Sequence, residues 1–421
     1  KNWGFCLSYN NFKKLKKNSK YKVVINSSHF KGHLDFTELV IKGKSSKEIL
    51  IVSYICHPSM ANNELSGPLI IMALSKLLRP MKYTIRLVLI PETIGAIAYI
   101  IRHRNVNQSK NKPKSNEKRY AAVELGGTSI RVAIAEGKAD NIVERDQFPT
   151  TTPEKDIPKL IQWLKCRQPF VSLGIASFGP IDPRKGSATY GFITTTPKKA
   201  WRNTDLVGPF KKAFDCPIGF DTDVNAPAFY EYEHAKSLGA DITSCAYVTV
   251  GTGVGVGLVV NGKNVHGMLH PEAGHVLCPQ MPNDTFKGLE DWTIPMGVEA
   301  HTCSLALAKQ SNVSIAQLKD LKDDNPIWDT AAYYLAVLCV NLILIASPER
   351  IVLGGGVFNR TCLYDKVRSQ VQRLLNGYIQ VDSVTTSKID SFIVSPIHKG
   401  DAGLVGALSL SIASSSSSKQ Q

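Results

Sequence analysis

The chain has 421 residues, of which 20% are charged, a formal net charge of +15 and a pI near 9.3. This length excludes a chain too short to bury a core and predicts two or three domains, while the positive charge favours anionic ligands. The nine cysteines are scattered and odd in number, which argues against a disulfide scaffold and predicts a reducing, cytoplasmic setting. The chain begins at Lys1, so an upstream targeting segment stays open.

The first hundred residues have the pattern of a small α/β unit. Apolar runs predict strands at residues 21–25, 39–41, 48–54 and 84–90, and residues 67–78 have a helical pattern. A segment around His57 and another around Glu92 follow two of these strands.

These two segments resemble a family of zinc-dependent aminopeptidase-like proteins. In that family a His, an Asp and further ligands build a metal site, but Asn63 stands here where the resemblance implies the bridging Asp. An amide does not carry the charge of a carboxylate between metal ions. We therefore expect residues 1–101 to form a truncated, inactive aminopeptidase-like module. A metal-dependent hydrolase built on His57 and Glu92 is the alternative.

Residues 102–119 are rich in Lys and Arg and have almost no apolar side chains. Such a segment cannot bury a core, which predicts a basic flexible linker. A nucleic-acid-binding arm is the alternative. Because no aromatic residues are interleaved for base stacking, we expect no specific nucleic-acid partner.

Residues 120–135 predict a strand, a tight turn and a second strand. The turn holds Gly126, Gly127 and Thr128, and Glu124 precedes it. Bare backbone N–H groups, a hydroxyl and an acid at one strand end are what phosphates and Mg²⁺ require. We expect the turn to bind phosphate and Glu124 to be a candidate magnesium ligand.

A polar run, Asp-Thr-Asp-Val-Asn, ends the strand predicted near residue 220. It contains Asp223 and Asn225. One interpretation is a helix N-cap, because Asp and Asn cap well before an apolar-periodic segment. The other makes Asp223 a general base that takes the proton of an attacking hydroxyl. The two interpretations are compatible, because a helix N-cap does not use all of the run's two acids and one amide.

A second glycine-rich stretch lies at residues 251–257, between two β-branched runs. It can be a bulged hairpin, or its small residues can admit a phosphate to bare N–H groups. A third stretch ends a buried strand, where a flat adenine and ribose could lie. Three such stretches favour a nucleotide cleft. The expected contacts of the second and third stretches are Gly251, Thr252, Gly253, Gly255, Gly354, Gly355 and Gly356.

Residues from about 120 to 410 resemble the ROK sugar kinases, and their fructokinase branch in particular. The resemblance is carried by six motifs in the family's order: residues 124–128, 174–182, 188–197 followed by Trp201, 221–225, 251–255 and 270–275. It implies a two-lobed, actin-like, ribonuclease-H-like α/β fold, with lobes at residues 120–235 and 236–412. It also implies Asp223 as the base, with Glu272, His275, Glu290 and Asn225 as sugar ligands.

One departure concerns zinc. Related fructokinases follow the Glu-x-Gly-His cluster with a Cys/His zinc loop, whereas here residues 284–288 run directly into Leu289 and Glu290. His275 keeps only Cys278, His301 and Cys303 as candidate partners, and a tetrahedral site needs four ligands at defined spacing. We therefore do not expect zinc on His275.

Two further segments complete the chain. The apolar run at residues 331–346 predicts a core helix, because Asn341 interrupts it and a buried strand follows. The Ser-rich residues 413–421 are expected to be a disordered tail.

The sequence thus predicts transfer of phosphate from Mg²⁺-ATP to a hexose, with fructose to fructose 6-phosphate as the favoured reaction. We expect no membrane partner, and a homodimer is allowed. An impaired sugar- or nucleotide-binding protein of kinase fold is the alternative. The preferred hexose stays open.

Overall fold

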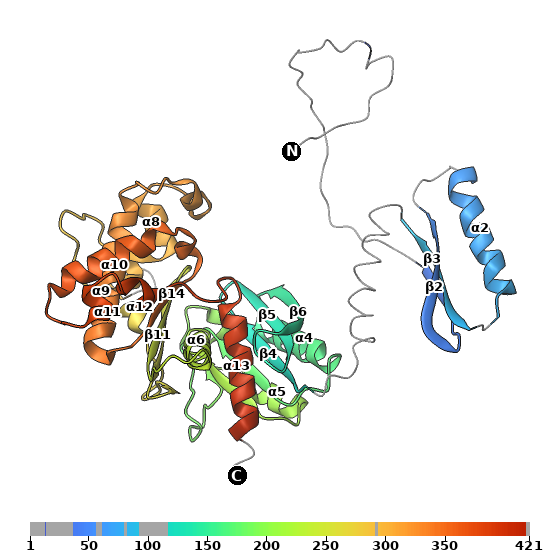
Figure 1. Ribbon diagram of the computed structural model, residues 1–421, viewed down its shortest axis with the longest axis horizontal. Coiled ribbons are helices and arrows are strands. Elements are labelled where there is room, and N and C mark those ends of the chain that lie inside the picture. Colours follow the sequence, from blue (N-terminus) through green and yellow to red (C-terminus); the bar gives the residue numbers. More distant parts are fainter. Residues whose placement is uncertain are drawn as a thin grey trace. The chain divides into compact units, whose positions relative to one another are not determined.

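The computed structural model describes residues 13, 37–55, 61–79, 82–91, 117–290 and 294–417. The chain divides into two compact units, residues 1–115 and 116–421 (Figure 1). The strand expected at residues 21–25, the side chains of His57, Asn63 and Glu92, and most of the expected linker lie outside the described residues.

The first unit is a three-stranded sheet with one helix. Its elements are β1 (Thr37–Ile41), β2 (Ser45–Tyr54), α2 (Ala61–Leu77) and β3 (Tyr83–Ile90), with strand order β1-β3-β2. The strands β2 and β3 run parallel and α2 connects them, which makes a βαβ crossover. Ile71 of α2 packs against Ile85 and Leu87 of the sheet. The strands expected at residues 39–41, 48–54 and 84–90 and the helix at 67–78 are confirmed.

The first lobe of the second unit is a five-stranded sheet of order β10-β7-β4-β5-β6. Three strands form an antiparallel meander, and β7 and β10 extend it in parallel with β4. Its elements are β4 (Arg119–Leu125), β5 (Ser129–Glu136), β6 (Ile142–Pro149), α4 (Pro153–Lys165), β7 (Leu173–Ser177), β8 (Phe192–Ile193), η1 (Lys199–Trp201), β9 (Thr204–Asp205), α5 (Val207–Ala213) and β10 (Ile218–Thr222).

The second lobe repeats this topology. Its sheet has the order β13-β12-β11-β14-β15, again with an antiparallel meander extended by two parallel strands. Its elements are β11 (Cys245–Val250), β12 (Val254–Val260), β13 (Lys263–Asn264), η2 (Ala273–His275), α7 (Val298–Thr302), α8 (Ser304–Gln310), η3 (Ile315–Asp320), α9 (Ile327–Ala346), β14 (Ile351–Gly354), η4 (Gly356–Asn359), α10 (Cys362–Leu375), α11 (Asp382–Thr385), α12 (Ile389–Phe392) and β15 (Ile393–Val394). The repeat agrees with the two-lobed architecture expected from the sequence.

Two helices, α6 (Asn225–Ser237) and α13 (Ala402–Ser417), lie side by side between the two sheets (Figure 1). The helix α13 packs closely on the first sheet, because a Cβ at Gly174 would lie 1.8 Å from the carbonyl oxygen of Ala407. The start of α6 packs equally closely on the second sheet, where a Cβ at Gly257 would lie 1.9 Å from the Val224 oxygen. These contacts join the lobes into one unit.

The helix α13 continues to Ser417, into the Ser-rich segment that we expected to be disordered. Its serine hydroxyls bond back to the helix: Ser414 Oγ donates to the Ser411 oxygen over 2.8 Å, and Ser415 Oγ to the Ile412 oxygen over 2.7 Å. Composition alone did not reveal that these hydroxyls bond within a helix.

The long apolar helix α9 forms the centre of the second lobe's core. Among the described residues it alone is long and apolar enough to cross a membrane, but most of it is buried inside the protein. Tyr334 and Leu338 are fully covered by neighbouring elements. The run at residues 331–346 is therefore a core helix, as predicted.

Candidate active site

Asp223 follows β10 at the carboxyl end of three parallel strands. Its backbone N–H donates to the oxygen of Ser177, the last residue of β7, over 2.8 Å. Burial, together with the negative charges of Glu124 and Glu272, raises the pKa of Asp223 to about 7. Acids from both lobes therefore act on one carboxyl group, and that group can exchange a proton near neutral pH.

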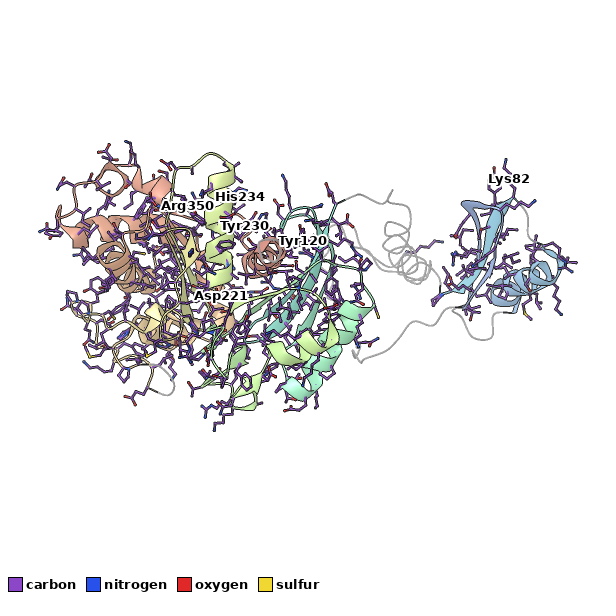
Figure 2. The ribbon with its side chains drawn as sticks, turned by 90° about the horizontal axis from the view of Figure 1, so that it is seen from below. Lys82, Tyr120, Asp221, Tyr230, His234 and Arg350 are labelled. Atoms are coloured by element: carbon purple, nitrogen blue, oxygen red, sulfur yellow. The ribbon has the colours of Figure 1, made fainter. Side chains whose placement is uncertain are left out.

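Asp221 and Asn225, the first and last residues of the polar run, form hydrogen bonds within the protein. The Asn225 amide donates to Asp221 over 2.9 Å and accepts the N–H of Leu258 over 3.0 Å. Asp221 also accepts from Asn264 over 2.7 Å and lies 2.9 Å from His266 Nε2. The labelled Asp221 in Figure 2 thus ties the first lobe to the second, and Asn225, expected to bind sugar, has its polar atoms engaged.

The first glycine turn, residues 126–128, closes the hairpin between β4 and β5. The Gly126 N–H donates to the Ser129 oxygen over 3.0 Å, and Thr150 Oγ1 donates to the Gly126 oxygen over 2.8 Å. Thr128 is exposed. These bonds fix the backbone of the turn and leave the Gly127 and Thr128 edge open.

Lys198 reaches this turn, although it comes from the distant segment before η1. A Cβ on Gly127 would lie 3.3 Å from Lys198 Cε and 3.8 Å from its Nζ. Among the described residues, no carboxylate lies within ion-pair distance of this amine. Sequence reasoning missed Lys198, because nothing in the chain marks which residue of its polar segment turns toward the glycines.

Glu124, the candidate magnesium ligand, lies beside Arg131 of β5. The Arg131 Nη2 is 2.6 Å from the carboxylate, and Nη1 is 3.2 Å from Asp401. Burial raises the pKa of Glu124, and Arg131 opposes this effect. A carboxylate already paired with a guanidinium is a poor direct ligand for a hard cation, which prefers uncommitted oxygens. The geometry suits an indirect role, in which Glu124 adds negative charge beside Asp223.

The second glycine turn, residues 251–253, occupies the equivalent place between β11 and β12. The Gly251 N–H donates to the Gly253 oxygen over 2.8 Å, and Thr252 is exposed. The third glycine stretch lies directly beside this turn, because β14 pairs with β11 and a Cβ on Gly251 would lie 4.0 Å from Gly356 N.

Gly355 has a φ of +88°, and a Cβ there would lie 2.4 Å from the Val250 oxygen. Only glycine fits this position without strain. Gly354 starts the same close approach, packing against Tyr247. Gly255 faces Val224, beside Asp223. The structure therefore gathers the second and third glycine stretches, and Gly255 of the second lies beside the residue that follows the proposed base.

Glu299 of α7, which sequence reasoning also missed, supports the second turn. Its Oε2 accepts the Val254 N–H over 2.6 Å, and a Cβ on Gly253 would lie 2.6 Å from the same oxygen. Its only sequence signal is a lone acid in an apolar segment.

The residues expected to bind sugar lie in different surroundings. Glu272 is exposed, and its Oε1 is 3.6 Å from the buried His270 Nδ1. His270 Nε2 accepts the N–H of Ile181 over 3.0 Å, which holds the Glu272 segment against the first lobe. His275 is partly buried, and Glu290 is exposed next to residues outside the described part. Glu272 thus lies close to Asp223, and His275 close to Glu299, while within the described residues no contact links Glu290 to them.

The side chains around His275 do not fit a zinc site. Cys278 Sγ donates to the Met296 oxygen over 3.1 Å, His301 Nδ1 lies 3.1 Å from the Gly297 oxygen, and Cys303 packs in an apolar cluster. Within residues 117–290 and 294–417, no three His, Cys, Asp or Glu side chains gather as metal ligands do.

A tyrosine network occupies this region instead. Tyr334 Oη donates to Asp284 over 2.6 Å and accepts the Met281 N–H over 3.2 Å. The Tyr334 ring stacks on His301 with centroids 4.4 Å apart, and Phe286 meets the other edge of His301 at 5.9 Å. Protein side chains therefore anchor the loop that carries Leu289 and Glu290.

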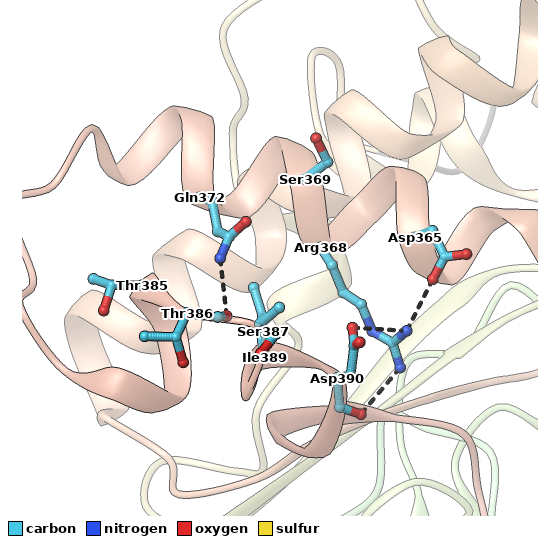
Figure 3. Close-up of a pocket in the computed structure, with 9 residues that line it drawn as sticks. All are labelled: Asp365, Arg368, Ser369, Gln372, Thr385, Thr386, Ser387, Ile389 and Asp390. Atoms are coloured by element: carbon cyan, nitrogen blue, oxygen red, sulfur yellow. Dashed lines mark hydrogen bonds and ion pairs between the residues drawn. The ribbon is translucent and has the colours of Figure 1, made fainter.

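A separate surface pocket of about 380 Å³ lies between α10 and the α11–α12 segment (Figure 3). Its one arginine, Arg368, is 3.0 Å from Asp365 and 3.2 Å from Asp390, and also donates to the Ile393 oxygen over 2.8 Å. The guanidinium is already neutralised, and the pocket contains none of the predicted site residues.

Comparison with known proteins agrees with both resemblances drawn from the motifs. Residues 120–414 match the ROK family, and residues 17–112 match a domain of unknown function (DUF4910). A putative fructokinase from Bacillus subtilis is 35% identical over 292 residues, covering 68% of this chain and 93% of the relative. A fructokinase from Zymomonas mobilis is 36% identical over 306 residues, covering 71% and 98%.

The aminopeptidase-like resemblance has a narrower basis. A putative polysaccharide biosynthesis protein with an aminopeptidase-like domain, from Clostridium acetobutylicum, is 37% identical over 150 residues. That match covers 34% of this chain and 33% of the relative, so only a fragment of that protein is represented here.

Solved structures confirm the fold. A ROK hexokinase from Thermus thermophilus superposes with a TM-score of 0.55 at 21% identity, covering 72% of this chain and all of that one. A ROK family glucokinase from Streptomyces griseus, in complex with glucose and AMPPNP, gives 0.52 at 18% identity, covering 71% and 100%. The two-lobed kinase fold predicted from the motifs is therefore correct.

Proposed function

This chain belongs to the ROK family, and we propose that it is an ATP-dependent hexose kinase that converts fructose to fructose 6-phosphate. The observation that carries the proposal is Asp223, whose pKa is raised to about 7 by burial and by Glu124 and Glu272. Hexose phosphorylation rests on the family and the fold. Fructose is favoured because relatives at about 35% identity are named fructokinases.

Phosphoryl transfer requires positioning, charge compensation and a base. Asp223 in its ionised form takes the proton of the 6-hydroxyl as the hydroxyl oxygen attacks the γ-phosphate, and ADP leaves. The open N–H groups of the two glycine turns hold the phosphates, and the Gly354–Gly356 stretch lies where the nucleoside can pack. Mg²⁺ bound to ATP supplies the remaining positive charge.

The sugar hydroxyls require partners that donate and accept hydrogen bonds. Glu272 and His275 supply them from the second lobe. Glu290 joins them only if its loop moves inward, because it is exposed and has no contact with them in this structure.

A coupled assay of ADP release, with fructose, glucose, mannose and N-acetylmannosamine in the presence of Mg²⁺, tests the proposal. We expect the highest kcat/KM with fructose, and fructose 6-phosphate as the product in a reaction coupled to its isomerisation. Turnover of none of the four sugars, with thermal stabilisation by ATP or fructose retained, would identify a binding protein of kinase fold instead.

A further inference from the structure

Several buried polar atoms at or near the site lack hydrogen-bond partners within the described residues, and two of them belong to neighbouring side chains. These two are Oε1 of Glu299 and Nδ1 of His275. Glu299 is 4% exposed, so its unpaired oxygen receives almost no compensation from bulk water. Burial raises the pKa of Glu299, and His275 opposes this effect.

The two side chains face each other across a short gap. Glu299 Oε1 lies 3.9 Å from His275 Nε2, which is longer than a hydrogen bond but needs a shift of only about 1 Å to become one. Catalytic hydrogen bonds are often long before substrate binds and shorten in the complex.

The other oxygen of Glu299 holds the second glycine turn. It accepts the Val254 N–H over 2.6 Å, while the Val254 carbonyl oxygen would lie only 1.8 Å from a Cβ on Gly274, next to His275. A single carboxylate therefore contacts the turn proposed to bind phosphate and faces the histidine proposed to bind sugar.

We propose that Glu299 is a positioning residue that couples the second glycine turn to His275. As the sugar enters, Glu299 Oε1 accepts the His275 Nε2–H, while Glu299 Oε2 keeps the Val254 N–H. A neutral histidine with its proton on Nε2 has a lone pair on Nδ1. The carboxylate thus fixes the tautomer and the ring orientation of His275, whose buried Nδ1 is then an acceptor. This inference rests on the proposed function.

The test compares KM values for fructose and for ATP in four variants. Glu299→Gln keeps an oxygen that can accept the Val254 N–H, but its NH₂ group then faces His275. A donor at that place favours the histidine tautomer with its proton on Nδ1 instead of Nε2. We expect this variant to raise the fructose KM about tenfold, which corresponds to the loss of one charge-assisted hydrogen bond. The ATP KM should stay within about twofold of its natural value.

Glu299→Ala removes both contacts, so both KM values should rise. Glu299→Asp, which keeps the charge on a shorter side chain, should recover part of the fructose affinity. The matched control is Glu231→Gln: Glu231 is equally buried and accepts the Ile397 N–H over 2.8 Å, away from His275. Its KM values should equal those of the natural protein.

A double-variant cycle isolates the coupling. In a His275→Ala background, Glu299→Gln should cause no further rise in the fructose KM, because the residue acts through His275. Additive effects, or equal rises in both KM values for Glu299→Gln, would overturn the inference. If the natural protein binds fructose without turning it over, the proposed function fails, and the same cycle measured as fructose Kd still decides the coupling.

Discussion

The two lobes have the same strand order and place a glycine turn at the same position, yet they support the two turns with opposite charges. The first turn, residues 126–128, has the Lys198 amine beside Gly127. The second, residues 251–253, is followed by Val254, whose N–H is held by the buried Glu299 carboxylate. The two turns therefore have equivalent backbone positions but side chains of opposite charge beside them.

The difference assigns the turns distinct roles. A free cation beside an open turn adds charge compensation directly to a phosphate. A buried carboxylate behind a turn repels phosphate. Its role is therefore to hold the backbone of the turn in place. We expect the first turn to contribute mainly to the transferred phosphate and the second mainly to geometry.

The largest effect should come from the residue between the turns. Asp223→Asn removes the base, and kcat should fall by about 10²- to 10⁴-fold, measured by ADP release. Fructose and ATP affinities should change little. The exposed Asp146→Asn is the control. A kcat within a factor of about three of the natural value would rule out general-base catalysis by Asp223.

The same carboxyl group sets the pH dependence. Because its folded-state pKa is raised to about 7 from the ordinary 3.8, kcat/KM should rise with pH up to about 7 and then level off. For stability the sign is opposite: the folded protein binds the proton more tightly, so the free energy of unfolding falls as pH rises from about 4 to 7. Asp223→Asn should therefore raise Tm at pH 8 and have little effect at pH 4, in thermal scans.

The next effect concerns the charge at the first turn. Lys198→Ala should lower kcat/KM for ATP by about 10- to 100-fold, because the phosphate loses a cation. Lys199→Ala, an exposed neighbour, is the matched control and should stay near the natural value. Lys198→Arg should recover part of the loss. Equal behaviour of the two lysine variants would remove the distinction between the turns.

A smaller, steric effect should separate two glycines of the second turn. A Cβ on Gly253 meets Glu299 at 2.6 Å, whereas on Gly251 its nearest neighbour is 4.0 Å away. Gly253→Ala should therefore raise the ATP KM by several-fold and lower Tm, while Gly251→Ala should preserve Tm. Measuring both by kinetics and thermal scans checks this, and an equal loss of Tm in the two variants would contradict it.

The smallest effect should come from metal removal. Treatment with 1,10-phenanthroline, with Mg²⁺ kept present, should leave Tm and the fructose KM unchanged, because the side chains around His275 do not form a zinc site. A rise in the fructose KM on chelation would show that a bound metal ion supports the sugar site.

Tyr334→Phe removes the hydrogen bond to Asp284. We expect it to lower Tm by about 2–4 °C, which corresponds to the loss of about 1 kcal/mol of stability.

The sequence predicted most of the fold, and it identified the glycine turns and the acid that make up much of the candidate site. Gly126, Asp223 and Gly253 lie in short contiguous motifs, and contiguous motifs can be read directly. Lys198 and Glu299 could not be predicted, because their positions depend on contacts between distant segments. Asn225 shows a third limit: a polar run reveals that side chains are needed there, but not which of them turn into the protein.

The helix α13 has a consequence for how the protein is made. It is synthesised after both sheets of the unit formed by residues 116–421, yet it packs on the first of these two sheets at Gly174 and Gly219. The first lobe therefore has this face uncovered until α13 has been synthesised. During that interval the uncovered lobe is exposed to chaperones and to aggregation.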